Sequence, residues 1–253
     1  MIALIGNLSR DLLPGQAPRA GGGPFHGARA LRRLRVPARI FGRAARQDRD
    51  ALFPPVVRLG TPARFVQGAA TATFSFSYDG DVRTMFVEKL GDVWEPSDLP
   101  KLGSTRWVHV APLSRHEFPT RTIAALARAH RVLLDGQGLV RVPETGPLRL
   151  DDDFDRELLR HVWVLKVAEE EAEVLGDPTA LGVREVLLTQ GSRGSTVYYG
   201  GRSEFIPAHA LDVDPTGAGD AFSTAYIVAR NAGFSPPSAA RRATAVVAAV
   251  LAQ

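Results

Sequence analysis

Asp214-Pro215-Thr216-Gly217-Ala218-Gly219-Asp220 joins a short loop to an apolar segment with the composition of a helix. Two glycines flank one alanine, so the backbone can bend tightly and approach a ligand closely. Unpaired amides at the start of a helix bind anions, and the amides of Gly217, Ala218 and Gly219 are placed to do so. Asp220 lies in the same turn, where it either caps the helix or faces a substrate. A carboxylate beside an anion site suits phosphoryl transfer, because it can take the proton of an attacking hydroxyl group.

The longer pattern Asp-x-Thr-Gly-Ala-Gly-Asp-Ala-Phe resembles the C-terminal signature of the ribokinase-like (PfkB) carbohydrate kinases. The resemblance implies a three-layer αβα sandwich with a mostly parallel sheet. It also implies transfer of the γ-phosphoryl group of ATP, with Mg²⁺, to a hydroxyl of a sugar or polyol. Asp220 would be the catalytic base and residues 217–219 the anion hole, with Asp214 and Thr216 beside the nucleotide. A Walker phosphate-binding motif is absent from the sequence.

The composition fits one globular domain. The 253 residues are 45% hydrophobic and 23% charged, which is enough for a full core, and we expect a single domain over residues 1–253. The chain has no cysteine, no apolar run long enough to span a bilayer and no signal-like start, so we expect a cytoplasmic protein without membrane contact. The net charge of +4 comes from scattered arginines, which argues against nucleic acid as a partner.

The N-terminal part predicts part of the acceptor pocket. Residues 2–5 form an apolar strand, and Asp11 follows it where α/β sheets place ligands, although a turn residue is the alternative. Gly22 and Gly23 then open a helix and resemble the N-terminal signature of the family, with His26 where that pattern has Asn. The resemblance implies sugar binding by Asp11 and His26, with close backbone approach at the two glycines. Further on, Pro54-Pro55 predicts an early helix end.

Residues 63–88 predict a flap. Polar and apolar residues alternate on both sides of an Asp79-Gly80 turn, which is a hairpin signal. In the family a β lid covers the sugar and often joins two subunits, so we expect a small β-hairpin lid and a homodimer through it. The segment between Asp11 and Gly21 is short for lid strands, which predicts a reduced lid. An ordinary hairpin at the sheet edge is the alternative.

Residues 107–141 read as strand, helix and strand, which implies a parallel βαβ unit. Asp135, Gln137 and Arg141 follow the second strand at the end of the sheet that faces ligands. The form Asp-x-Gln-Gly…Arg resembles the myo-inositol kinase branch of the family, which implies a polyol or cyclitol acceptor bound by Gln137 and Arg141. Pairing of Arg141 with a surface carboxylate is the alternative.

The donor side is expected after two later strands. Lys166, Ala168 and Glu171 resemble the family's Lys-x-Asn-x-x-Glu, whose Asn and Glu help to order magnesium and phosphates. Ala168 replaces the Asn, which leaves Glu171 as an indirect magnesium residue and Lys166 as a donor residue. The resemblance places Thr189 and Gly191 along the nucleotide, with Gly194 supporting the turn.

Two other functions remain open. A nucleoside kinase would use the same machinery, with an aromatic residue such as Phe74, Phe76 or Phe86 stacking on the base. A non-catalytic relative that binds sugar or nucleotide would account for the loss of the Asn at residue 168.

Overall fold

A nine-stranded sheet forms the middle layer of the molecule, in the order β14-β13-β12-β11-β9-β8-β1-β4-β5. The computed structural model describes residues 1–79, 82–208 and 214–252. The strands of the sheet are β1 (Ile2–Asn7), β4 (Ala38–Ala45), β5 (Ala63–Gly68), β8 (Trp107–Ala111), β9 (Arg131–Asp135), β11 (Val164–Ala168), β12 (Glu185–Thr189), β13 (Gly194–Tyr199) and β14 (Arg202–Pro207). The strands from β12 to β5 in this order run parallel to one another, whereas β13 pairs antiparallel with β12 and β14 pairs antiparallel with β13. The predicted mostly parallel sheet is therefore confirmed.

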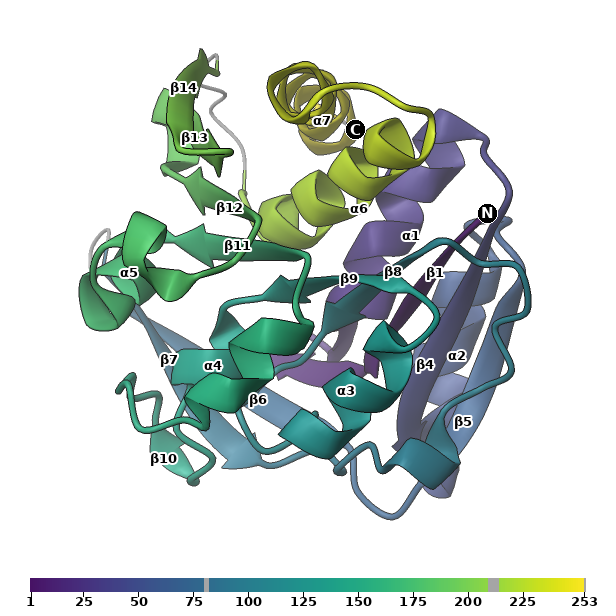
Figure 1. Cartoon of the computed structure of the whole chain (residues 1–253). Helices are drawn as coiled ribbons and strands as arrows, with labels where there is room; N and C mark the ends of the chain where they lie inside the picture. Colours follow the sequence, from purple (N-terminus) through teal and green to yellow (C-terminus); the bar gives the residue numbers. More distant parts are fainter. Residues whose placement is uncertain (80–81, 209–213, 253) are drawn as a thin grey trace.

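Helices cover both faces of the sheet (Figure 1). Alternate residues of β1 face opposite sides, so Ile2 and Leu4 join one apolar core while Ala3 and Ile5 join the other. The first core is closed by α1 (Gly23–Leu34), α2 (Arg49–Val57), α6 (Ala218–Asn231) and α7 (Pro236–Leu251), and the second by α3 (Thr120–Ala127), α4 (Gln137–Val140) and α5 (Glu169–Leu175). This is the predicted three-layer αβα arrangement.

The lid is larger than the sequence predicts. A second sheet has five strands in the order β10-β7-β6-β2-β3, namely β10 (Gly146–Pro147), β7 (Val82–Lys89), β6 (Ala72–Asp79), β2 (Ser9–Leu12) and β3 (Arg19–Gly21). The predicted hairpin is β6 and β7, and Gly80 of its predicted turn lies outside the described residues. The expected start at residue 63 is wrong, because β5 pairs with β4 in the main sheet. The expected reduction is also wrong, because β2 and β3 are lid strands despite their shortness.

Helix α2 also departs from the prediction. It continues through Pro54 and Pro55 to Val57. Leu52 and Val56, one helical turn apart, are buried in the first core. Their packing stabilises the helical path where the two prolines remove backbone donors.

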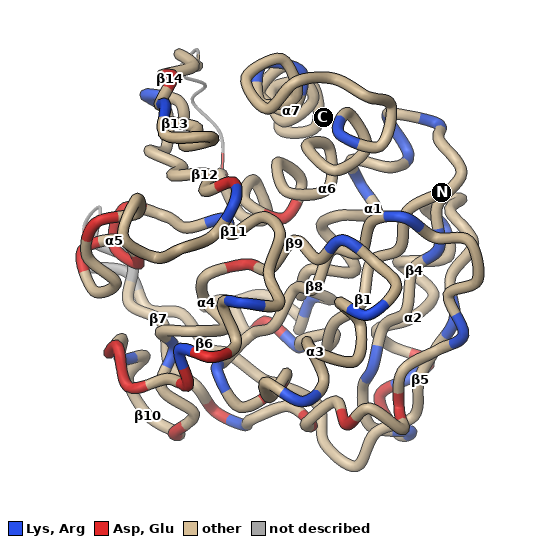
Figure 2. Tube along the Cα trace, viewed as in Figure 1, with Lys and Arg blue, Asp and Glu red and all other residues tan. Residues whose placement is uncertain are grey.

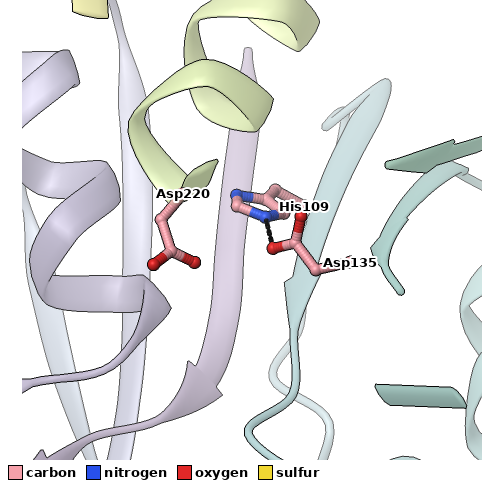
Figure 3. A group of neighbouring side chains, drawn as sticks. All are labelled: His109, Asp135 and Asp220. Atoms are coloured by element: carbon pink, nitrogen blue, oxygen red, sulfur yellow. Dashed lines mark hydrogen bonds and ion pairs between the residues drawn. The ribbon is translucent and has the colours of Figure 1, made fainter. Parts of the chain in front are cut away.

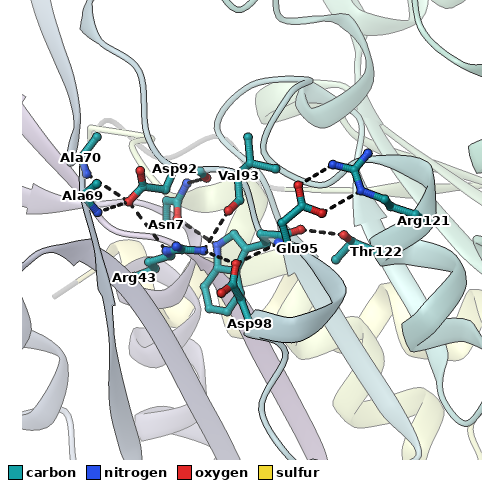
Figure 4. A network of polar contacts seen from close by, with 11 residues as sticks. Asn7, Arg43, Ala69, Ala70, Asp92, Val93, Glu95, Asp98, Arg121 and Thr122 are labelled. Atoms are coloured by element: carbon teal, nitrogen blue, oxygen red, sulfur yellow. Dashed lines mark hydrogen bonds and ion pairs between the residues drawn. The ribbon is translucent and has the colours of Figure 1, made fainter.

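A polar network fixes the connection from the lid to β8 (Figure 4). Nη1 of Arg43 donates to the Val93 carbonyl and to Oδ2 of Asp98, each over 2.8 Å. Nδ2 of Asn7 donates to the Asp92 carbonyl over 2.8 Å, and Oδ1 of Asn7 accepts from Nε1 of Trp94 over 2.9 Å. Since Asn7 and Arg43 lie near the carboxyl ends of β1 and β4, this connection is held against the sheet end that carries the candidate site.

In the part of the chain that the structure describes, charged residues are spread over many elements, and Lys and Arg form no single stripe in the view of Figure 2. Among the helices of the described residues, none has both the length and the apolar composition that a bilayer crossing requires.

Candidate active site

The glycine-rich loop enters helix α6 through a tight turn. Oδ1 of Asp214 accepts hydrogen bonds from the Thr216 amide over 2.9 Å and from its hydroxyl over 2.6 Å. Gly217 follows as the N-cap, with φ 80° in the left-handed region that favours glycine. Asp214 and Thr216 are exposed or half-buried residues that shape this turn, and no feature of the structure tests their predicted role beside a nucleotide.

Two of the three predicted anion-hole amides are available in this conformation. The Ala218 amide donates to the Pro215 carbonyl over 2.9 Å. The amides of Gly217 and Gly219 have no such partner within residues 1–79, 82–208 and 214–252. An anion at the N-terminus of α6 would therefore meet two free amides and the positive end of the helix dipole.

Asp220 lies in the first turn of α6. Its Oδ1 is buried and makes no hydrogen bond with the described part of the chain. Burial raises the pKa of Asp220 above its ordinary value, and the nearby Asp135 carboxylate adds to the rise. Three neighbouring groups oppose the shift: His26, His109 and Lys166. An unpaired carboxylate with an increased affinity for protons has the properties of a general base.

Beside Asp220 lies the buried pair of His109 and Asp135 (Figure 3), of which the sequence reasoning placed only Asp135 at the end of the sheet that faces ligands and gave neither residue a role. Nε2 of His109 lies 2.6 Å from Oδ2 of Asp135, and neither side chain is more than 2% exposed. One ring nitrogen of His109 and one carboxylate oxygen from each of Asp135 and Asp220 lie within 4.8 Å of one another. The signal in the sequence was a lone histidine inside the apolar strand Trp-Val-His-Val-Ala, which by itself does not distinguish a site residue from a core residue.

Lys166 is buried beneath the glycine-rich loop, and its role in binding the phosphoryl donor stays a prediction. A β-carbon built on Gly219 would lie 3.0 Å from Nζ of Lys166. Burial alone would lower the pKa of Lys166, but the carboxylates of Glu171, Asp135 and Asp220 raise it above the ordinary value. The side chain is thus a fixed positive charge under the predicted anion hole.

The predicted acceptor glycines and His26 converge on the same point. A β-carbon on Gly23 would overlap Ala111 and lie 2.9 Å from Oδ1 of Asp220. Gly22, with φ 89°, is the N-cap of α1. Nδ1 of His26 is buried without a hydrogen-bond partner in the described chain, and burial lowers the pKa of its imidazole.

Asp11 reaches this site from the lid strand β2. Its Oδ1 accepts from the Ser9 hydroxyl over 2.7 Å, and its negative charge acts on His26 in the direction of a higher pKa. The lid, helix α1 and helix α6 therefore each contribute at least one predicted residue to one region.

Gln137 and Arg141 lie in and just after α4, and both are half-buried. The Arg141 guanidinium makes no hydrogen bond or ion pair with the described residues, so the surface carboxylate weighed as its alternative partner is not found among them. The positive charge of Arg141 acts to lower the pKa of Lys166 and the pKa of Glu117. An arginine held near the site without a partner is available to a substrate.

The remaining donor-side residues have structural contacts of their own. Thr189 donates its hydroxyl to the Val167 carbonyl over 3.2 Å. Gly191 and Gly194 have φ of 56° and 128° and shape the turn into β13. Oε2 of Glu171 accepts from the Ala168 amide over 2.8 Å, which caps helix α5. The predicted nucleotide and magnesium roles of these residues are not tested by these contacts.

Comparison with known proteins identifies the family to which the chain is similar. Residues 78–253 match the model of the pfkB family carbohydrate kinases. The chain is 30% identical over 203 residues to an inositol 3-kinase of Zea mays, covering 78% of this chain and 52% of that protein, and 25% identical to a fructokinase of Rhizobium leguminosarum bv. trifolii, covering 89% and 76%. It spans about half the length of the maize relative.

Among solved structures, a pyrophosphate-dependent kinase in the ribokinase family, complexed with a pyrophosphate analog and myo-inositol, superposes with a TM-score of 0.87. The identity is 26%, and the match covers 100% of this chain and 96% of that one. The fold is therefore ribokinase-like, as predicted. The family model matches more than half of this chain, and the glycine-rich loop that resembles the family signature lies within the match. This chain therefore belongs to the pfkB family of carbohydrate kinases.

Proposed function

We propose that this chain transfers the terminal phosphoryl group of a polyphosphate donor to a hydroxyl group of a polyol or sugar. The observation that carries the proposal is the buried, unpaired Oδ1 of Asp220 beside the free amides of Gly217 and Gly219. Asp220 takes the proton of the acceptor hydroxyl, whose oxygen bonds to the terminal phosphorus as the bond to the leaving phosphate breaks. The two amides and Lys166 stabilise the negative charge of the moving group.

A cyclitol such as myo-inositol is the acceptor we favour. The maize relative is an inositol 3-kinase, and the pyrophosphate-dependent kinase was solved with myo-inositol. A ring of hydroxyl groups needs many donors and acceptors, which Asp11, His26, Gln137 and Arg141 can supply. The 25% identity to a fructokinase supports a sugar as the second candidate.

ATP is the donor implied by the signature loop, and pyrophosphate is the second candidate. The 26% identity and the TM-score of 0.87 to a pyrophosphate-dependent kinase support pyrophosphate as that second candidate. Both donors present a terminal phosphate to the same amides and to Lys166. They differ in the leaving group, which is ADP in one case and orthophosphate in the other.

Magnesium fits this site in a supporting role. Mg²⁺ binds oxygen ligands and keeps several waters, so phosphates and waters would form most of its shell. Glu171 has one oxygen on the Ala168 amide and a second one for a magnesium-bound water. When bound, the metal neutralises charge on the donor phosphates.

The two other functions receive less support. Phe74 and Phe76 are only 5% and 7% exposed and pack with Val87 in the core of the lid sheet, so they offer no face to a nucleoside base, whereas Phe86 is half-buried and stays a candidate for stacking. A non-catalytic relative needs no unpaired base, whereas Asp220 is present and unpaired. A homodimer through the lid rests on the family resemblance alone, and light scattering after size-exclusion chromatography would test it.

The test is product release with each donor across a panel of acceptors. Mg·ATP and Mg·pyrophosphate would each be incubated with myo-inositol, fructose and a nucleoside, with ADP or orthophosphate measured and Asp220→Asn as the blank. Turnover with a polyol or sugar that the variant lacks is the expected result. Equal turnover by both proteins, or turnover on the nucleoside alone, would overturn the proposal.

A further inference from the structure

Helix α6 presents three polar side chains on one face. Asp220, Ser223 and Thr224 are spaced by three and four residues, which places them on the same side of a helix. Ser223 and Thr224 are completely buried. Buried hydroxyl groups nearly always have hydrogen-bond partners, and the partners of Ser223 and Thr224 show what this face of the helix is fixed to.

Both partners belong to the buried pair on the central strands. Oγ of Ser223 donates to Oδ1 of Asp135 over 2.7 Å. Oγ1 of Thr224 lies 3.1 Å from Nδ1 of His109, and Nε2 of His109 lies 2.6 Å from Oδ2 of Asp135. If Nε2 donates to the carboxylate, Nδ1 accepts from the threonine hydroxyl, and every group in the set is satisfied.

The pair of His109 and Asp135, to which the helix is anchored, is itself rigid. His109 lies on β8 and Asp135 on the adjacent parallel strand β9, in the middle of the nine-stranded sheet. Apolar packing alone lets a helix rotate or slide by small amounts, whereas two buried hydrogen bonds to a fixed pair define its rotation and its position along its axis. The first turn of α6 carries both Asp220 and the loop amides, so a rotation of the helix or a shift along its axis would displace them together.

Titratable groups from four elements face Asp220. They are Asp135 on β9, His109 on β8, Lys166 on β11 and His26 on α1. Asp135 is held by its two hydrogen bonds at a fixed distance from the base and remains ionised, because His109 and Lys166 lower its pKa against the effect of burial. The Asp135 carboxylate thus anchors helix α6 and also contributes to the electrostatic field at Asp220.

We propose that His109 and Asp135 are positioning residues for phosphoryl transfer, which hold Asp220 and the loop amides in place through the hydroxyl groups of Ser223 and Thr224. The proposal rests on the proposed function of Asp220. None of the four residues needs to touch the substrate.

The helix supplies its own control. Tyr226 is also completely buried on α6, and its hydroxyl donates over 2.6 Å to Glu185, away from the pair. Ser223→Ala, Thr224→Val and Tyr226→Phe each delete one buried hydroxyl from the same helix. A merely structural role predicts similar losses of stability and unchanged turnover for all three variants.

The experiment measures kcat, KM and the midpoint of urea unfolding for these variants, with Thr224→Ser as the conservative replacement. We expect Ser223→Ala and Thr224→Val to lower kcat roughly 10- to 100-fold with little change in KM, because small displacements of a reacting group have effects of this size. Thr224→Ser should restore most of the rate, and Tyr226→Phe should keep it. The pH at which kcat/KM falls on the acid side should move in Ser223→Ala, because its partner Asp135 is freed to shift.

Equal rates in Ser223→Ala, Thr224→Val and Tyr226→Phe would overturn the positioning role and leave the proposed function intact. Failure of the proposed function has a different signature, which is full turnover in Asp220→Asn. If His109→Asn is also made and proves unfolded, the three hydroxyl deletions still decide the question.

Discussion

The imidazole of His26 packs directly against the α-carbon of Gly217, so that a β-carbon at residue 217 would overlap the ring. One residue comes from the helix after the first glycine-rich turn and the other from the loop before α6. The contact joins the predicted acceptor side of the site to the predicted anion hole. A side chain at residue 217 would therefore disturb both at once.

Gly217→Ala should lose activity beyond what backbone strain explains. The change adds a β-carbon at φ 80° and also an overlap with His26. Gly233→Ala is the matched control, because Gly233 has φ 93° with open space around it. We expect both to lose about 1 kcal/mol or more of folding free energy from strain. Only Gly217→Ala should lose most of its kcat/KM, measured at a temperature where both variants are folded. Similar rates in the two variants would contradict the contact.

Asp220→Asn should retain ligand binding and lose turnover. The amide keeps the shape of the carboxylate but cannot accept the proton, which removes a general base worth roughly 10²- to 10⁴-fold in rate. Calorimetric titration with the acceptor would show near-normal affinity, while kcat falls. A variant that keeps full turnover would remove Asp220 from the role of base.

Arg141→Ala should raise the KM of the acceptor more than that of the donor. The guanidinium has no partner among the described residues, so its deletion costs little stability. Arg149→Ala is a control from the same region, since Arg149 is exposed and pairs with Glu144. We expect unchanged kinetics for Arg149→Ala and an acceptor KM about 10-fold higher or more for Arg141→Ala. An unchanged acceptor KM would place Arg141 outside the pocket.

Glu117 should make stability fall as pH rises. Its side chain is completely buried, and burial raises its pKa to about 7, against the opposing hydrogen bond from the Leu113 amide. The folded state holds this proton more tightly than the unfolded state, so the stabilisation is full below about pH 4.5 and is lost as pH rises to about 7. The loss amounts to at most about 3 kcal/mol.

Glu117→Gln mimics the protonated acid and should abolish that dependence. Urea unfolding at pH 5 and pH 8 would show wild type and variant alike at the lower pH and the variant more stable at the higher one. Glu170→Gln, at an exposed position, should follow wild type at both. A Glu117→Gln variant that follows the wild-type pH profile would refute the assignment.

Local features were readable from the sequence alone. The turn at Gly217 needs a left-handed backbone, the start of α1 needs Gly22, and β1 alternates between two buried faces. Each of these depends on a few adjacent residues, whose steric limits and periodicity act regardless of the rest of the chain. The αβα fold class, by contrast, was implied by the family resemblance of the loop that carries Asp220, and not by these local features alone.

Packing decided where local preference was weak. Pro54 and Pro55 predict a helix end, but the burial of Leu52 and Val56 keeps α2 helical to Val57. The short strands β2 and β3 look insufficient for a lid, yet β2 gains a parallel partner in β6, which is more than 60 residues later in the chain. Such partners are supplied by the tertiary structure, so their stabilising effect cannot be read from a short window of sequence.

The sequence determined the chemistry of the glycine-rich loop, and the tertiary structure decided what surrounds it. His109 and Thr224 are 115 residues apart, and Asp135 and Ser223 are 88 residues apart. They meet because the strand order sets β8 beside β9 and lays α6 across both. Contacts over such separations arise only when the whole sheet is assembled, since the entropy of closing the intervening chain is offset by the complete core.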